Sequence, residues 1–371
     1  MLKQLQEKIF KNILRILPKA LNDSVPRGIK ETLLMKYYLR DFYIDILGSC
    51  NLACPSCPAA GIKMLDGSIQ KNRGGKMSIK MFEKIVDRIA QEHPGTQISL
   101  FNWTDPLVRP DFEKFMEAIH SRGLKSCIST NLNILRDPDG FAKIAPQTLI
   151  ISLSGFSQSI YEQGHQSGDI EVVKDNMRKL SEAYHKANAP LKSVTIYFHK
   201  YVYNLHEASL MKDYVTSLGF SFRTSWAYYM PIERVFSYME NQLPELEKKY
   251  IESKFVLNIK KVINAGHSYK NKSCQLKRTT NIDCRGEVQL CCAIYDTEKF
   301  SLGPYLETST KDIAKKVLNH NYCKTECAKH SLDIYANWHA LPISSVYEAN
   351  AQDELRKKGL DKNGRPLAKE I

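Results

Sequence analysis

Short apolar runs alternate with longer stretches of helical periodicity between about residues 42 and 224. The short runs are typical of strands, and the stretches that repeat apolar positions every three or four residues are typical of helices. Six strands are predicted, at 42–47, 97–101, 125–129, 148–152, 193–198 and 221–224. Helices are predicted at 78–92, 111–121, 140–144, 170–187 and 205–217, with Gly123 and Gly219 at helix stops. Such repeated βα units form a parallel sheet.

The alternation stops near residue 235, and the composition changes from there on. A charged stretch with helical periodicity predicts a linker over 236–265, and six cysteines then crowd into residues 274–327. This shift marks a second domain, which we place at 266–345. Residues 346–371 are expected to form a basic tail, and the run from Glu354 onward lacks apolar periodicity, which is typical of a solvated segment. We therefore expect an α/β protein with an open, partial (β/α)6 barrel over 41–235 and a small C-terminal cysteine-rich domain.

The first seventeen residues place most of their apolar side chains near one face of a helix, with basic residues elsewhere. A basic amphipathic helix of this kind either packs on its own protein or lies on an anionic membrane. Packing is the expectation we prefer for this N-terminal segment (1–40), and peripheral membrane contact is the alternative. Pro18 is expected to end or kink the helix.

Composition narrows the class of protein. With 371 residues, 43% of them hydrophobic, the chain can bury a large core. It has ten cysteines but no apolar signal segment ahead of a cleavage site, which favours a reducing cytoplasm over a disulfide-bonded secreted domain. No apolar run is long enough to span a bilayer. Lys and Arg outnumber Asp and Glu by 53 to 40, and this net charge of +13 favours anionic partners.

Three cysteines directly after the first predicted strand are the strongest chemical signal. Cys50, Cys54 and Cys57 form a C-x3-C-x2-C run. Three thiolates can hold three irons of a [4Fe-4S] cluster and leave the fourth iron open for another ligand. A structural zinc site is the alternative, but it prefers tighter C-x2-C pairs and a fourth ligand nearby. The spacing therefore predicts a reactive iron-sulfur cluster in this loop.

This motif, in this position after the first strand, resembles that of the radical SAM superfamily. In the family the open iron binds S-adenosylmethionine, and an electron from the cluster splits the sulfonium to give a 5′-deoxyadenosyl radical. The resemblance also implies the partial barrel, in which the loops after the strands build the active site. S-adenosylmethionine and a [4Fe-4S] cluster are therefore the expected cofactors, and a flavodoxin or ferredoxin is the expected electron donor.

The stretch after the second predicted strand resembles a further motif of the family. Relatives carry Gly-Gly-Glu-Pro there, and this chain has Asn102-Trp103-Thr104-Asp105-Pro106. Asp105 supplies the acidic side chain, one methylene shorter, while both glycines are replaced. The resemblance implies that Asn102, Thr104 and Asp105 surround the methionyl amino group. Read without the family, this stretch is an ordinary turn.

Later strand ends continue the resemblance. Thr130 and Asn131 resemble the family's Thr-Asn-Gly turn and join the expected cofactor-binding set. Ser152 begins a stretch similar to the family's Ser-Ile-Asp-Gly, and is expected at the methionyl carboxylate or the ribose. His165 stands near the place where relatives carry an arginine that pairs with the carboxylate, so it would act as a protonated partner or as a neutral donor. A surface histidine is the alternative.

A second cysteine pattern lies past the barrel. Cys274, Gly286 and Cys291 have a C-x(9-15)-G-x4-C spacing, which resembles the hairpin that opens a SPASM domain or its short form, the twitch domain. Cys323 and Cys327 would complete four thiolates for one auxiliary [4Fe-4S] cluster. The longer SPASM form needs a C-x2-C-x5-C-x3-C run that this chain lacks. A zinc ribbon built from the same cysteines is the alternative.

Two further cysteines, Cys284 and Cys292, remain outside this set. Cys284 is an alternative to Cys274 as a cluster ligand, and a buried inert thiol is the default reading of both spare cysteines. Either thiol is also a candidate to donate a hydrogen atom to a substrate radical. Hydrogen return from a cysteine gives epimerisation, whereas electron transfer to the auxiliary cluster gives dehydrogenation.

Three functions are consistent with these patterns. The first is a radical SAM oxidoreductase or epimerase for a small or carbohydrate-like substrate, which the basic charge suggests is anionic. The second is maturation of a ribosomally made peptide, for which the segment before the first strand, residues 1–40, is short as a leader-binding module. The third is a non-catalytic zinc protein that binds nucleic acid, with slight support from aromatic and basic residues near 197–203. The run of βα units speaks against the third.

Overall fold

The computed structural model describes residues 41–60, 74–269, 274–336 and 343–367. The chain divides into two units, Met1–Leu39 and Arg40–Ile371, and the described residues all belong to the second. The predicted N-terminal amphipathic helix, its end at Pro18 and its membrane contact lie outside the described residues. None of the described helices is long and apolar enough to cross a membrane.

One sheet of nine strands runs through the described residues, in the order β6-β5-β4-β3-β2-β1-β7-β8-β9. The strands are β1 (Asp41–Ile44), β2 (Gln97–Ser99), β3 (Lys125–Thr130), β4 (Thr148–Leu153), β5 (Val194–Lys200), β6 (Ser221–Trp226), β7 (Thr279–Ile282), β8 (Glu287–Gln289) and β9 (Ser301–Pro304). Strands β1 to β6 pair in parallel with their neighbours. The predicted series of βα units is therefore confirmed, with small shifts at the strand ends.

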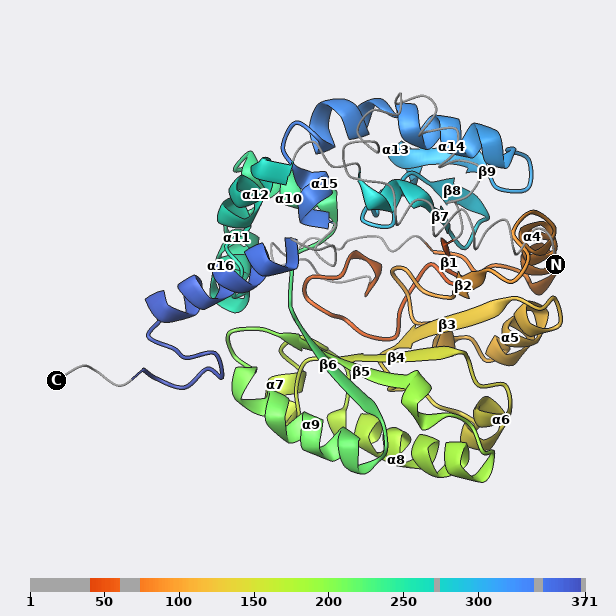
Figure 1. The fold of residues 1–371 in the computed structure, drawn as a ribbon, viewed down its shortest axis with the longest axis horizontal. Helices are drawn as coiled ribbons and strands as arrows, with labels where there is room; N and C mark the ends of the chain where they lie inside the picture. Colours follow the sequence, from red (N-terminus) through yellow and green to blue (C-terminus); the bar gives the residue numbers. More distant parts are fainter. Residues whose placement is uncertain (1–40, 61–73, 270–273, 337–342, 368–371) are drawn as a thin grey trace, which may run out of the picture. The chain divides into compact units, whose positions relative to one another are not determined.

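Helices connect the parallel strands and lie along the outside of the sheet (Figure 1). They are α4 (Ile79–Glu92), α5 (Phe112–His120), α6 (Pro138–Lys143), α7 (Gln158–Tyr161), α8 (Ile170–Lys186) and α9 (Ala208–Ser217). Short polar side chains cap several of their first turns, as Ser78 does by accepting from the Met81 amide and Asp169 by accepting from the Glu171 amide. Gly123 and Gly219 follow α5 and α9 as predicted.

The two faces of the parallel strands differ in chemistry. The outer face, toward the helices, carries apolar side chains that are 2% exposed or less, among them Phe42, Ile98, Ile128, Ile151 and Ile196. Alternate residues point to the other side, which we call the inner face. It carries polar side chains that are partly exposed: Tyr43, Ser129, Ser152, Tyr197 and His199. Burial of the outer face stabilises the fold, whereas the inner face is polar and partly exposed.

The cysteine-rich C-terminal part continues the same sheet. Strand β7 pairs in parallel with β1, and β7, β8 and β9 pair antiparallel in order. Gly286 lies at the bend between β7 and β8 with a φ of +84°, a conformation that favours glycine. The predicted β-hairpin with glycine at its bend is thus present. It is joined to the first strand of the barrel by backbone hydrogen bonds.

A group of helices follows the barrel and precedes the end of the chain (Figure 1). They are α10 (Ile232–Met239), α11 (Glu245–Lys254), α12 (Ile259–Gly266), α13 (Thr297–Phe300), α14 (Thr310–Asn319), α15 (Leu332–Ala336) and α16 (Ile343–Lys357), with a π-helix at Cys323–Cys327. Short 3-10 turns span Pro58–Ala60, Pro106–Val108, Leu191–Ser193, Leu205–Glu207, His267–Tyr269 and Gln275–Arg278. Helices α11 and α12 fall mainly within the predicted helical linker.

The stretch predicted as a basic tail, 346–371, begins as part of helix α16. Tyr347, Ala351 and Leu355 are each 2% exposed or less. They are spaced by four residues and so form one narrow stripe along the helix. Because this stripe is a single residue wide, the basic residues around it hide its periodicity in the sequence. The tail prediction is wrong for residues 346–357.

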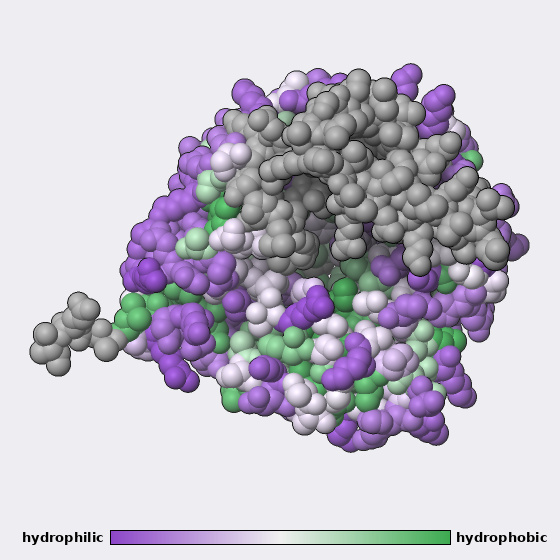
Figure 2. Space-filling view, viewed as in Figure 1, coloured by the Kyte–Doolittle hydropathy of each residue, from purple (hydrophilic) through white to green (hydrophobic). Residues whose placement is uncertain are grey.

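The surface of the described residues is mainly polar. Hydrophilic side chains gather along the outline of the molecule, with hydrophobic ones scattered between them (Figure 2). The large exposed apolar residues are Val172, Leu210, Leu246, Leu306 and Leu367. Each comes from a different part of the chain, and apolar residues exposed singly are ordinary on a protein surface.

Candidate active site

The cysteine loop (residues 48–58) leaves the sheet after β1. Gly48 brings the start of this loop close to a neighbouring segment. Its amide donates to the Gly75 carbonyl at 3.0 Å, and a Cβ on Gly48 would lie 1.9 Å from the Gly74 oxygen. A side chain at position 48 would therefore force the two backbones apart. This contact fixes the loop at the carboxyl end of β1, where parallel βα folds place their active sites.

Three partly exposed thiols lie in this loop, those of Cys50, Cys54 and Cys57. Burial raises the pKa of Cys54, and the nearby thiols of Cys57 and Cys50 raise it further. As the side chains stand, no three or more His, Cys, Asp or Glu in the described ranges are grouped to hold a metal ion. The other cysteine of the first half, Cys127, lies on β3 and hydrogen-bonds to Ser99. The loop thus offers three neighbouring thiols, the number that suits a cluster with one open iron.

A buried carboxylate, that of Asp45, holds the loop after β2. Its Oδ1 accepts from the amides of Asn102, Trp103 and Thr104 at 3.0, 3.1 and 3.3 Å, and from the Thr104 hydroxyl at 2.9 Å. Asp45 is 2% exposed. These contacts order the backbone that stands in place of the family's two glycines. Motif reasoning missed Asp45, although an acidic residue within an apolar run is itself a signal.

Asp105 is buried as well, and its carboxylate accepts hydrogen bonds from two loops of the protein. Its Oδ2 accepts from the Thr130 hydroxyl at 2.8 Å and the Asn131 amide at 2.7 Å, while Oδ1 accepts from the Leu107 amide at 2.9 Å. Burial raises the pKa of Asp105, and these hydrogen bonds oppose that effect. Asp105 therefore ties the loop after β2 to the turn after β3. Its direct contact with a methionyl amino group stays a prediction.

Asn131 connects the turn after β3 with the cysteine loop. Its Nδ2 donates to Asn51 Oδ1 at 3.0 Å and lies 4.0 Å from the Cys50 sulfur. On the other side of the loop, the Cys57 sulfur lies 4.0 Å from the Trp103 carbonyl oxygen. The loops that follow β2 and β3 therefore meet the cysteine loop at Cys50 and Cys57, as expected for a site at the carboxyl edge of a parallel sheet.

Ser152 and His165 lie farther along the same edge. The Ser152 hydroxyl is 3.4 Å from that of Ser129 on the inner face. The His165 ring is partly buried, stacks on Tyr161 at 4.8 Å between centroids, and places Nδ1 2.8 Å from the Ser154 hydroxyl. Burial lowers the pKa of His165 to about 3, with a further contribution from His199. The ring is neutral near pH 7, which favours the neutral donor over the protonated partner.

Two more buried polar residues that motif reasoning missed hold the ends of β4 and β5. Glu207 accepts hydrogen bonds at Oε2 from the amides of Phe156 and Ser157 at 2.5 and 3.2 Å. Asn204 donates from Nδ2 to the Ser154 and His199 carbonyls at 2.7 and 2.8 Å. No short motif marks these residues, since each also contacts the stretch after β4, which lies 50 or 51 residues earlier in the sequence.

Four cysteines of the C-terminal part come from separate segments and lie close enough for their charges to influence one another, although as the side chains stand they are not grouped to hold a metal ion. Cys274 precedes β7, Cys291 follows β8, and Cys323 and Cys327 begin and end the π-helix. Burial raises the pKa of Cys327, and the charges of Cys274, Asp333, Cys291 and Cys323 raise it further. These are the four cysteines that the spacing predicts as ligands of an auxiliary cluster.

The two remaining cysteines have different surroundings. Cys284 is buried near the hairpin bend, and its thiol donates to the Gly74 carbonyl at 3.2 Å. Cys292 is partly exposed and lies near Tyr43 on the inner face, whose pKa is raised by burial and then by the Cys292 charge. With its amide turned to satisfy both atoms, Asn102 donates to the Cys292 carbonyl at 3.1 Å. Cys292 therefore lies beside the loop after β2.

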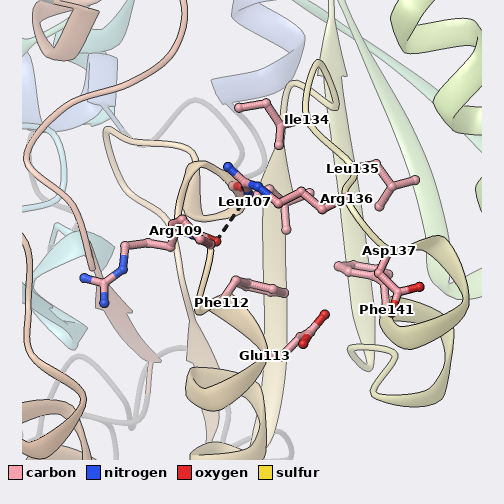
Figure 3. Close-up of a pocket in the computed structure, with 10 residues that line it drawn as sticks. Leu107, Arg109, Phe112, Glu113, Ile134, Leu135, Arg136, Asp137 and Phe141 are labelled. Carbon is pink, nitrogen blue, oxygen red and sulfur yellow. Dashed lines mark hydrogen bonds between the residues drawn. The ribbon is translucent and has the colours of Figure 1, made fainter.

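A small pocket of about 30 Å³ lies between the segments that follow β2 and β3 (Figure 3). The Arg136 guanidinium donates to the carbonyls of Leu107 and Arg109 at 2.6 and 3.4 Å. Arg109 in turn forms an ion pair with Asp111 at 2.6 Å. A space of this size holds about one water molecule, and none of the predicted site residues lines it. We therefore regard this pocket as a gap in the packing of two loops and not as a ligand site.

A comparison with protein families agrees with the site at the cysteine loop. Residues 44–207 match the model of the radical SAM superfamily, and this stretch contains the loops after β1, β2, β3 and β4. This part of the chain is a radical SAM domain, and the family's cofactors are S-adenosylmethionine and a [4Fe-4S] cluster. The predicted family and cofactors are thereby confirmed. No match is found among curated proteins.

Solved structures share the fold at low sequence identity. SuiB of Streptococcus suis bound to S-adenosylmethionine is 14% identical, with a TM-score of 0.51 over 99% of this chain and 87% of that chain. SuiB bound to precursor peptide SuiA is 14% identical, with a TM-score of 0.51 over 87% and 80%. Native anSMEcpe with bound AdoMet is 15% identical, with a TM-score of 0.47 over 74% and 79%. The likeness to SuiB confirms the predicted fold class.

Proposed function

We propose that this chain is a radical SAM enzyme of the SPASM or twitch type that removes a C-H hydrogen from a small, carbohydrate-like substrate. The observation that carries the proposal is the three-thiol loop at the carboxyl end of β1, inside the radical SAM domain. The alternative zinc site needs a fourth ligand beside these thiols. Cys127, the other cysteine of this half, is engaged with Ser99 instead.

The residues around the loop fit the two cofactors. Cys50, Cys54 and Cys57 would hold the cluster, and the polar loops after β2 and β3 would hold S-adenosylmethionine. When bound, this pair supplies a 5′-deoxyadenosyl radical that takes a hydrogen atom from an unactivated carbon. The chain's own part is orientation: Asp45 orders the backbone of 102–104, and Asn131 joins that site to the cysteine loop.

Cys274, Cys291, Cys323 and Cys327 are the proposed ligands of one auxiliary [4Fe-4S] cluster. Four thiolates leave no iron open, which suits electron transfer better than substrate binding. Loss of an electron to this group and of a proton to a base would turn the substrate radical into a dehydrogenated product. A flavodoxin or ferredoxin is the proposed electron donor.

A hydrogen-atom transfer from Cys292 is the basis of a second possible reaction at this site, epimerisation of the substrate carbon. Its partly exposed thiol lies near the inner face, whereas Cys284 is buried against the segment before α4. If Cys292 transfers its S-H hydrogen atom to the opposite face of the substrate radical, the carbon is inverted. The sulfur radical that remains then takes one electron from the reductant and one proton. Between the two spare thiols, the surroundings favour Cys292 as this donor.

The inner face favours a small polar substrate. Ser129, Ser152, Tyr197 and His199 present hydroxyl and imidazole groups from three neighbouring strands, and all four are partly exposed. Such groups suit the hydroxyls of a sugar or related ring. Peptide maturation is the second candidate, because the fold is shared with SuiB, of which one structure contains precursor peptide SuiA.

Metal analysis tests the proposal directly. Protein purified without oxygen should contain about eight irons and eight sulfides per chain, as two [4Fe-4S] clusters require. Its paramagnetic resonance signal after reduction should change when S-adenosylmethionine is added, and dithionite should then yield 5′-deoxyadenosine. Stoichiometric zinc without sulfide, or a reduced signal indifferent to S-adenosylmethionine, contradicts the proposal.

A further inference from the structure

Two buried amide oxygens on neighbouring strands have no hydrogen-bond partner among the residues that the structure describes. They are Oδ1 of Asn281 on β7 and Oε1 of Gln289 on β8. The two residues are only 1% and 2% exposed. A buried polar atom without a partner lowers the stability of the folded state, so proteins keep few of them. Two of them side by side call for an explanation.

The orientation of each amide follows from its nitrogen. Asn281 Nδ2 donates to the Thr279 hydroxyl oxygen at 3.1 Å, and that hydroxyl gives its own hydrogen to the Leu276 carbonyl at 2.9 Å. Gln289 Nε2 faces the Glu287 carbonyl oxygen at 3.5 Å. Turning either amide would bring its oxygen against a lone pair. Both oxygens therefore remain the ends that need a donor.

The strand register puts both amides in one row with Tyr43. Asn281 is paired with Gln289 across the β7–β8 hairpin and with Tyr43 across the parallel β1–β7 pair. Paired residues project on the same side of a sheet, so all three share the inner face. Tyr43 is partly exposed and packs edge to face on Phe101 at 5.7 Å, directly before the loop that Asp45 holds. The row thus runs from the hairpin to the candidate active site.

We propose that the carboxamide oxygens of Asn281 and Gln289 form a substrate subsite that accepts two hydrogen bonds from neighbouring hydroxyl or amino groups on a sugar or cyclitol ring. This inference rests on the proposed function and narrows its substrate class. Two unpartnered acceptor oxygens favour a ligand group that can donate two hydrogen bonds. Tyr43, with its partly exposed ring, forms the side of the subsite toward the cysteine loop.

Thermal stability distinguishes a binding role of Asn281 and Gln289 from a purely structural one. A residue kept for stability has its polar atoms satisfied in the free protein, whereas a binding residue leaves them unsatisfied until the ligand arrives. Asn281→Leu and Gln289→Met keep the approximate size and remove the oxygen. Both variants should therefore unfold at the same temperature as the parent or a few degrees higher.

Binding to defined probes tests the ligand class. The full-length chain, reconstituted without oxygen, is titrated with myo-inositol and with glucosamine, and with cyclohexanol as a ring that offers one donor. We expect one of the first two probes to bind more tightly than cyclohexanol. Asn281→Leu and Gln289→Met should each weaken that binding about tenfold, the loss of one good hydrogen bond. Preference for glucosamine would identify an amino group, and preference for myo-inositol would identify hydroxyls.

Asn176→Leu is the matched control, because Asn176 is a buried asparagine on α8 whose Nδ2 donates to the Leu132 carbonyl at 3.0 Å. It should lower the unfolding temperature and leave probe binding unchanged. The inference is overturned if neither polyhydroxylated probe binds, or if Asn281→Leu lowers the unfolding temperature like the control without changing binding, as a buried structural water would require. Iron and sulfide in the same samples report on the proposed function separately, since the probes need no cluster to bind.

Discussion

The two cysteine sets of this chain are built in opposite ways. Cys50, Cys54 and Cys57 come from a single loop after one strand, and the loop is anchored by its own neighbours. Cys274 and Cys291 flank a hairpin, while the remaining pair of the second set comes from a π-helix some thirty residues later. The first set is local in sequence and the second is assembled by folding.

This difference also separates their chemistry. The first set has three partly exposed thiols near the polar loops of the radical SAM domain. The second has four cysteines, of which Cys327 is buried, and its neighbours raise the pKa of that thiol. Three ligands suit a cluster that reacts, and four suit one that only exchanges electrons. The comparison makes distinct predictions for each set.

The largest effect is expected at the local set. Replacing Cys50, Cys54 and Cys57 together by alanine should reduce 5′-deoxyadenosine formation under dithionite to the level of the protein-free control, because no ligand for the reactive cluster remains. Chromatographic quantification of 5′-deoxyadenosine checks this. Cys127→Ala, which removes a cysteine outside both sets, is the control. An unchanged yield in the triple variant would refute the assignment.

The assembled set should show a partial phenotype. Cys323→Ala is expected to lower iron from about eight to about four per chain, to keep some S-adenosylmethionine cleavage, and to impair product formation. Iron analysis and 5′-deoxyadenosine yield measure the two parts separately. Complete loss of cleavage at about four irons would mean that both sets depend on one another, contrary to the comparison.

Asp45 tests whether the local set depends on ordered neighbouring loops. Asp45→Ala removes the acceptor of four hydrogen bonds, so we expect faster amide exchange at residues 102–104, a destabilisation of about 2–4 kcal/mol and weaker S-adenosylmethionine binding. Hydrogen exchange followed by mass spectrometry reports on the loop directly. Asp175→Ala, on the exposed surface of α8, should change none of these. Normal exchange at 102–104 would contradict the role.

The two cysteines of the C-terminal part that lie outside the second set, Cys284 and Cys292, are expected to differ as hydrogen-atom donors. If the enzyme inverts a carbon, reaction in heavy water should place deuterium there, and Cys292→Ala should abolish this while Cys284→Ala keeps most of it. The reason is that Cys292 lies near the inner face and Cys284 is buried against Gly74. Mass spectrometry of the product measures the label. The reverse pattern would exchange their roles, and a carbonyl product would indicate dehydrogenation.

The smallest effect concerns pH. Because burial holds the pKa of His165 at about 3, below its unfolded value near 6.5, the folded state binds fewer protons than the unfolded state between these values. Its contribution to stability is complete above pH 6.5 and declines as the pH falls. Urea unfolding at pH 7.5 and 5.5 should show a drop that is smaller, by about 1 kcal/mol, in His165→Asn. Equal drops would indicate an ordinary pKa for His165.

The sequence alone predicted the order of the elements well. Strand and helix periodicities placed β1 to β6 and helices α4, α5, α6, α8 and α9 within a few residues, since these patterns are local, whereas the single-turn helix α7 was not predicted. The three-cysteine motif and the hairpin glycine, Gly286, were predicted for the same reason. The prediction failed at 346–357, where the apolar stripe of α16 is one residue wide. Short or narrow signals of this kind are lost among charged neighbours.

What the tertiary structure decided was which distant groups meet. Only the fold shows that Asp45 accepts from the loop at 102–104, that β7 joins β1, and that Asn281 and Gln289 share a row with Tyr43. Motifs record spacing along the chain, whereas hydrogen bonds between loops depend on distances across the sheet. The cysteine loop could therefore be predicted from the sequence by itself. The hydrogen bonds that order its neighbouring loops, and the proposed substrate subsite, could be identified only once the strands were paired.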